Sequence, residues 1–116
     1  MLPSKKGKMK IRTVSGDISP QNSGIIDAHN HCYINVPEWV RKKDSDLALD
    51  DLSICIEEMK LYKNAGGGTL VDCTAIDYGR DVAKLKEISE RTGVQIVATA
   101  GFKEDAFIRN WLEGRS

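Results

Sequence analysis

Residues 24–31 of the chain read Gly-Ile-Ile-Asp-Ala-His-Asn-His, a short apolar run that ends in two histidines. No other histidine occurs in the sequence. The run has the composition of a β-strand, and a break at Val36-Pro37 follows it. Alternate side chains of a strand share a face, so Asp27, His29 and His31 should project the same way, with the imidazoles roughly 6–7 Å apart. A bare His-x-His pair also fits ordinary surface or core residues, but this context predicts one edge of a metal site at the carboxyl end of a strand.

Composition limits the classes to which the chain can belong. A chain of 116 residues fits one small domain, and 17 basic and 17 acidic residues give zero formal charge. That balance argues against a binder of nucleic acid or of a membrane surface. No apolar run approaches the roughly 20 residues that cross a bilayer, and no signal peptide follows Met1. We expect a cytoplasmic protein with a disordered tail at residues 1–8.

The three cysteines are odd in number and widely spaced, at Cys32, Cys55 and Cys73. No Cys-x-x-Cys pair is present, so the spacing indicates neither a disulfide framework nor a thiolate zinc site. We expect reduced thiols in or near the core. Cys32 follows His31 directly, and adjacency on a strand should send it to the opposite face.

Hydrophobic periodicity predicts an alternation of strands and helices. A hairpin at residues 9–18 should be followed by strands at 24–31, 69–74 and 94–100, by amphipathic helices at 50–65 and 81–92, and by a third helix starting at 106–112. The glycines at 66–68 should end the first of these helices. Strands that alternate with helices through short connections indicate right-handed βαβ units, so the predicted fold class is α/β with a parallel sheet.

Four stretches carry further motifs in a fixed order. They are Met9–Ile18, Gly24–His31, Ala65–Thr74 and Gly79–Phe102, the last of which contains Gly79-Arg80-Asp81 and Thr92-Gly93-Val94. Together they resemble the amino-terminal portion of the phosphotriesterase-related branch of the amidohydrolase superfamily, from its hairpin to its third barrel strand. The chain departs from that branch at Asp27 and Asn30, where the family has a hydrophobic residue and Glu. Asp-x-His-x-His is common across the wider superfamily.

The resemblance implies a metal-dependent hydrolase of esters, lactones or phosphotriesters, acting on a small molecule. It also implies a (β/α)₈ TIM-type barrel, which typically needs about 250 residues. The chain supplies about three βα units after the hairpin, so residues 9–116 would form a partial barrel domain. His29 and His31 would hold one ion of a binuclear divalent site, with zinc the first choice.

By the same resemblance, the other ligands would come from later strands. They would be a carboxylated lysine on strand four, histidines on strands five and six, and an aspartate on strand eight that also acts as the base. None of these strands is in the chain, so we expect an amino-terminal fragment that is inactive alone, and its catalytic residues stay unassigned. Lys103 does not fall where the family places its bridging lysine.

Other polar residues near the predicted strand ends leave two interpretations open. Asp27 could accept a hydrogen bond from a metal-bound imidazole, or it could be a structural carboxylate inside the barrel. Asp72 and Thr74 project together from the second strand, and a hydrogen-bonding role in the core is favoured because the sequence names no partner for them.

Two alternative functions remain. A metal-dependent nuclease or cyclic amidase of the same superfamily is favoured by Asp27. A non-catalytic α/β domain that self-associates through its exposed sheet edges would also fit, because three strands leave unpaired edges and uncovered apolar surface.

Overall fold

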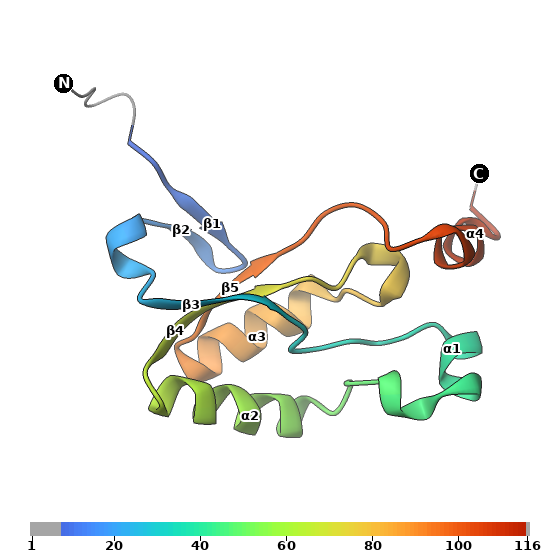
Figure 1. Ribbon diagram of the computed structural model, residues 1–116, viewed down its shortest axis with the longest axis horizontal. Coiled ribbons are helices and arrows are strands. Elements are labelled where there is room, and N and C mark those ends of the chain that lie inside the picture. Colours follow the sequence, from blue (N-terminus) through green and yellow to red (C-terminus); the bar gives the residue numbers. More distant parts are fainter. Residues whose placement is uncertain (1–7, 116) are drawn as a thin grey trace.

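The computed structural model describes residues 8–115, which form an α/β fold around a parallel sheet (Figure 1). In chain order the strands and α-helices are β1 (Ile11–Thr13), β2 (Gly16–Ile18), β3 (Ile25–Asn30), α1 (Glu38–Lys43), α2 (Leu52–Asn64), β4 (Gly67–Asp72), α3 (Val82–Thr92), β5 (Gln95–Ala98) and α4 (Asp105–Leu112). Short 3-10 helices are η2 (Pro20–Asn22), η3 (Ser45–Leu47) and η4 (Ile76–Tyr78). The predicted alternation is confirmed. Of the predicted tail, residues 1–7 lie outside the described residues.

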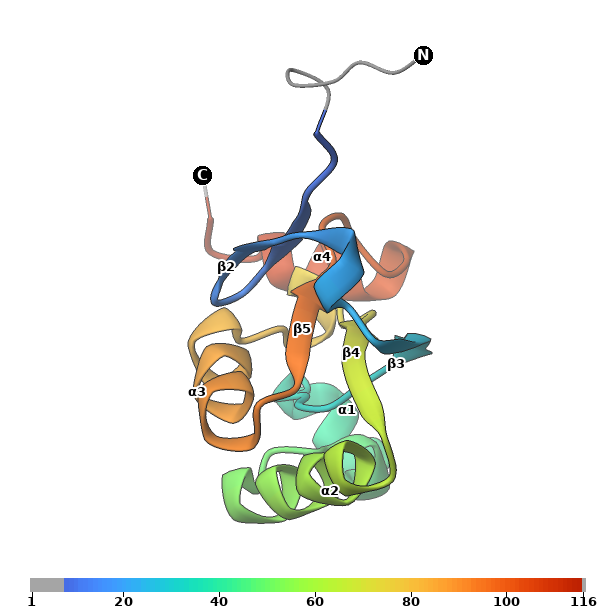
Figure 2. The ribbon, with the colours of Figure 1, turned by 90° about the vertical axis from the view of Figure 1, so that its left-hand side faces the viewer.

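The parallel sheet has the strand order β3-β4-β5, so each βαβ unit joins two neighbouring strands. The hairpin of β1 and β2 is antiparallel and is joined to β5 by a hydrogen bond from Val14 N to Ile96 O at 2.8 Å. Figure 1 shows α2 and α3 beneath the sheet, and Figures 1 and 2 both show the hairpin above β5. No helix within residues 8–115 is both long and apolar enough to span a membrane.

The main core lies between the sheet and the helices α2 and α3. Its most deeply buried members are fully enclosed aliphatic side chains from β4, α3 and β5, namely Leu70, Leu85, Ile88 and Ile96. Helix α2 adds Cys55, Ile56 and Met59, which recur at the helical spacing that predicted this face. Asp51 and Asp81 cap α2 and α3 by accepting hydrogen bonds from the backbone of the first turn. Each helix is thus fixed at its start by a polar cap and along its length by apolar burial.

Strand β4 begins two residues earlier than predicted, because two of the three consecutive glycines belong to the strand. Of these three glycines, only Gly66 has a positive φ, of +107°. A Cβ at Gly67 would overlap the ring of Tyr62, and a Cβ at Gly68 would overlap the carbonyl oxygen of Ser23. The second and third glycines therefore allow close packing of β4 against α2 and against the segment before β3.

Strand β3 has an unpaired edge within the described chain, whereas the outer edge of β5 meets the hairpin through the bond from Val14 N to Ile96 O. Strands β3 and β5 each pair in parallel with β4 alone. Ile25 is 65% exposed and Ile26 is 46% exposed. Apolar surface of this kind on an edge strand is typical of a sheet that continues into further structure or meets a partner.

Candidate metal-binding site

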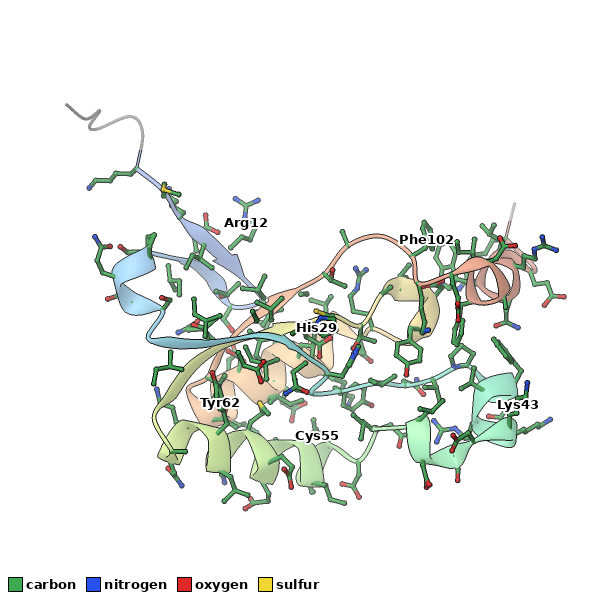
Figure 3. The ribbon with its side chains drawn as sticks, viewed as in Figure 1. Arg12, His29, Lys43, Cys55, Tyr62 and Phe102 are labelled. Atoms are coloured by element: carbon green, nitrogen blue, oxygen red, sulfur yellow. The ribbon has the colours of Figure 1, made fainter. Side chains whose placement is uncertain are left out.

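The two histidines lie together at the carboxyl end of β3. His29 is inside the strand, while His31 follows its last residue, Asn30. Their ring centroids are 6.0 Å apart with an angle of 75° between the planes, so the edge of one ring faces the other. His29 is exposed and His31 is half-buried. Figure 3 shows His29 where β3 passes into the segment that leads to α1. The sequence-based prediction that the two rings share one side of the strand is confirmed.

The backbone that carries the histidines is shaped by Asp27 and Asn30. Asn30 Nδ2 donates to Asp27 Oδ2 at 2.8 Å, and Asn30 Oδ1 accepts from His31 N at 2.8 Å. Asp27 Oδ1 accepts from His29 N at 3.3 Å. The pairing of β3 with β4 shifts register between Asp27 and Asn30, where these bonds replace regular ladder bonds. Among the described residues the Asp27 carboxylate bonds neither ring, so its predicted role beside a metal-bound imidazole stays a prediction.

His31 is held from the neighbouring strand. Its Nδ1 lies 2.8 Å from Thr74 Oγ1, just beyond the end of β4. Asp72, the last residue of β4, accepts from Thr74 N at 2.9 Å with one oxygen and from Cys32 N at 2.8 Å with the other. Asp72 and Thr74 are both fully buried. The sequence grouped Asp72 with Thr74 but gave no partner, and the structure identifies that partner as the segment around His31.

Burial also sets the protonation of His31. Desolvation lowers the pKa of His31 below its ordinary value, and the nearby charge of Asp72 opposes this shift. The neutral imidazole is therefore favoured at neutral pH, which is the form that binds a metal. Cys32 points into the core on the opposite face, as predicted, and its burial raises the pKa of its thiol. Cys32 therefore does not compete with the histidines for a metal at this end of the sheet.

An aromatic cluster continues from His31 toward α4. The ring of Tyr78 meets the ring of His31 edge-on at 5.8 Å, and Phe107 meets Tyr78 at 5.4 Å. The Lys103 ammonium lies over both aromatic rings, 5.1 Å from Tyr78 and 4.7 Å from Phe107. The single backbone N–H of Lys103 donates a bifurcated hydrogen bond to the buried carboxylate of Asp77, at 2.8 and 3.0 Å to its two oxygens. A cavity of about 350 Å³ opens beside these residues.

The two imidazoles lie close enough to reach a single metal ion, but they do not complete its coordination. With a Zn–N distance of about 2.0–2.1 Å, the ion lies about 3.2 Å from each ring centre, so two ligand rings can be at most about 6.4 Å apart. The observed separation of 6.0 Å satisfies this limit. Across residues 8–115 no three His, Cys, Asp or Glu side chains gather closely enough to hold an ion. Within the described residues the candidate site thus consists of two imidazoles.

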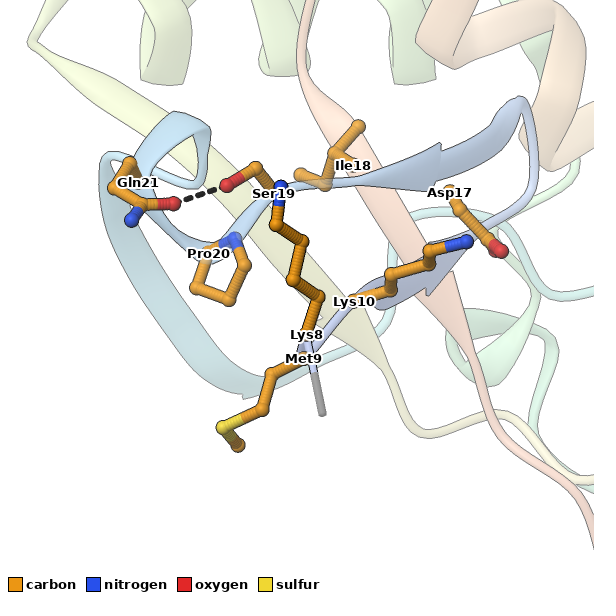
Figure 4. Close-up of a pocket in the computed structure, with 8 residues that line it drawn as sticks. All are labelled: Lys8, Met9, Lys10, Asp17, Ile18, Ser19, Pro20 and Gln21. Atoms are coloured by element: carbon orange, nitrogen blue, oxygen red, sulfur yellow. Dashed lines mark hydrogen bonds between the residues drawn. The ribbon is translucent and has the colours of Figure 1, made fainter. Parts of the chain in front are cut away.

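A larger cavity, of about 620 Å³, lies at the hairpin and is separate from the histidines (Figure 4). It is lined by residues 8–10 and 17–21. Its side chains are two lysines, one aspartate and small polar or aliphatic groups, with Ser19 bonded to Gln21. None of these is a histidine or a cysteine, so the two features share no residue.

The chain is similar to several known hydrolases. A lactonase from Listeria monocytogenes superposes with a TM-score of 0.78 and is 41% identical over 85% of this chain and 30% of that one. An organophosphorus hydrolase from Deinococcus radiodurans gives a TM-score of 0.69 and 32% identity over 88% and 31%. N-acetyltaurine hydrolase of Xenopus tropicalis is 31% identical over 84% of this chain and 36% of its own length.

The fold and these similarities identify the class and the family of the chain. The parallel sheet, its helices and its structural neighbours show part of a TIM-type barrel of the kind that carries hydrolases. The profile of the phosphotriesterase family matches residues 9–116, and the chain belongs to that family. The chain spans about a third of the length of the relatives it matches. The resemblance found in the sequence is thereby confirmed.

Proposed function

We propose that the chain contributes the first metal ligands of a metal-dependent hydrolase that acts on esters, lactones or phosphotriesters. The observation that carries the proposal is the pair His29 and His31, whose rings lie 6.0 Å apart at the carboxyl edge of a parallel sheet. In barrels of this type the active site occupies that edge. The lactonase and the organophosphorus hydrolase among the similar structures support these substrate classes.

We propose zinc as the metal, because neutral imidazole nitrogen suits it. Bound there, a divalent ion would polarise the scissile bond and lower the pKa of a water molecule. The role of this chain's own residues is to hold the ion: His29 presents an exposed ring, and His31 presents a neutral one. Catalytic zinc sites usually have three protein ligands, and two are described here, so the 116-residue chain alone should turn over little substrate. Its three free cysteines support a cytoplasmic location.

Zinc titration of the untagged 116-residue chain tests the proposal. Side-chain ¹H–¹⁵N spectra of the two imidazoles should shift on addition of Zn²⁺, and His29→Gln and His31→Gln should each weaken binding. Cys73→Ser is the matched control, because Cys73 follows β4 at the same edge and offers an alternative zinc ligand. Unchanged imidazole spectra at millimolar Zn²⁺, or loss of binding only in the Cys73 variant, would refute the assignment.

A second class of substrate is a candidate for the same site. Asp27 precedes the two histidines in an Asp-x-His-x-His pattern, which favours a nuclease or cyclic amidase. A relative named for hydrolysis of N-acetyltaurine also fits cleavage of an amide. A panel of a lactone, an aryl phosphotriester, a cyclic amide and an oligonucleotide separates these classes. The panel should be applied to a protein that includes this chain together with the remaining barrel strands.

A non-catalytic role has its own supporting observation. Ile25 and Ile26 are exposed on an edge strand that pairs on one side, so two copies could associate through β3. Sedimentation velocity over a range of concentrations would then show a dimer, and Ile26→Lys would restore the monomer. A monomer at all concentrations with zinc bound to the histidines would favour the hydrolase.

A further inference from the structure

Within residues 8–115, Thr74 is the only residue that shares a hydrogen bond with an imidazole of the candidate site. Its Oγ1 lies 2.8 Å from His31 Nδ1, and its side chain is fully buried. The two residues are 43 positions apart and come from the ends of adjacent strands. The hydroxyl has no other hydrogen-bond partner within residues 8–115. Its contact with His31 is therefore the interaction that satisfies this buried polar atom.

The contact is fixed from both sides by Asp72. One carboxylate oxygen of Asp72 accepts from the backbone N–H of Thr74, and the other accepts from that of Cys32, next to His31. This buried carboxylate, together with the backbone hydrogen bond from Cys73 N to Asn30 O at 2.8 Å, holds the two strand ends together. The ring of Tyr78, 5.8 Å from His31, adds an edge-on contact that restricts rotation of the imidazole.

We propose that Thr74 is a positioning residue that selects Nε2 of His31 as the metal-binding nitrogen. An imidazole has two ring nitrogens, and the one that is hydrogen-bonded is not free to bind a metal. With Nδ1 directed at Thr74, Nε2 is the nitrogen that remains. A hydroxyl can accept from Nδ1–H when Nε2 binds the metal, and it can donate to a bare Nδ1 when the metal is absent. Thr74 therefore suits His31 in both states, whereas a carbonyl oxygen would suit only one.

This inference rests on the proposed function, because it assigns the ligand atom within the same site. It predicts that Thr74→Val weakens the affinity of the untagged chain for Zn²⁺ by about tenfold, the lower end of the effect that such supporting groups have. Thr74→Ser keeps the hydroxyl and should remain within about twofold of the unsubstituted chain. Thr69→Val is the matched control: Thr69 is a buried threonine of β4 whose hydroxyl bonds Ser23 O at 2.6 Å, away from His31.

A readout that needs no metal separates this inference from the proposed function. Long-range ¹H–¹⁵N spectra of the metal-free chain report the state of each ring nitrogen, and Thr74→Val should shift Nδ1 of His31 while leaving His29 unchanged. If the chain binds no zinc but Thr74→Val still shifts Nδ1, the proposed function is refuted while the hydrogen bond between Thr74 and His31 is supported. If Thr74→Val does not fold, the unsubstituted chain still decides, because zinc should shift Nε2 of His31. Zinc binding through Nδ1 of His31 would overturn the inference. So would a folded Thr74→Val variant whose zinc affinity and Nδ1 shift equal those of the unsubstituted chain.

Discussion

Replacement of Asp72 by Asn should be among the most destabilising conservative changes at the candidate site. The carboxylate is fully buried and uses both oxygens, one for Cys32 N at 2.8 Å and one for Thr74 N at 2.9 Å. An amide keeps one acceptor oxygen and turns an NH₂ group toward the other N–H. The change removes a charge-assisted hydrogen bond of about 1.5–3 kcal/mol and leaves a buried donor unpaired, while it relieves part of the desolvation of the charge. We expect a net loss of about 2–3 kcal/mol in the free energy of unfolding.

Urea denaturation followed by circular dichroism measures this loss. With a slope of about 1–3 kcal/mol per molar urea, the midpoint should fall by about 0.7–3 M. Asp81→Asn is the matched control, because the Asp81 carboxylate caps α3 with one oxygen, which accepts from Lys84 N at 3.1 Å. Asn caps helices as well as Asp does, so the control should change stability by less than about 0.5 kcal/mol. Equal midpoints for the two variants would refute the reasoning.

Three further predictions follow from packing and burial. Gly79→Ala should destabilise the fold by about 1–2 kcal/mol more than Gly101→Ala in urea denaturation, because both glycines have positive φ but only a Cβ at Gly79 would meet neighbouring backbone. Tyr62→Phe should lower the free energy of unfolding by about 1–3 kcal/mol in the same measurement. The Tyr62 hydroxyl accepts from a backbone N–H of β3 at 3.1 Å and lies 2.7 Å from a carbonyl oxygen of β4. An unchanged midpoint would contradict this prediction. Burial raises the pKa of Cys32 and Cys55, so the unfolded chain loses these thiol protons first, and the melting temperature in reductant should fall as the pH rises above 9.0, the ordinary thiol value. A melting temperature that stays flat to pH 10 would contradict the last prediction.

The sequence predicted the elements whose signal is local, and it missed those that depend on tertiary contact. Periodicity predicted the strands and helices, and the His-x-His motif predicted that the two imidazoles lie close together. The start of β4 was missed because the need for Gly67 and Gly68 arises from close approach of Tyr62 and of the segment before β3, which no local pattern records. The partner of Thr74 was missed for a related reason. Its bond to His31 joins residues 43 positions apart, and only the register of β3 on β4 brings them together.

The hydrogen bonds at the carboxyl edge indicate that the histidine geometry is formed by this chain itself. The end of β3 is joined to the end of β4 through Asp72, and the loop after β4 is joined to the segment after β5 through Asp77, whose buried carboxylate accepts from Lys103 N. Two buried carboxylates therefore link three successive strand ends. Preorganised ligands need less ordering when the metal binds. Further barrel strands would add donors to the proposed metal site, while the His31 ring is already held by its contacts with Thr74 and Tyr78.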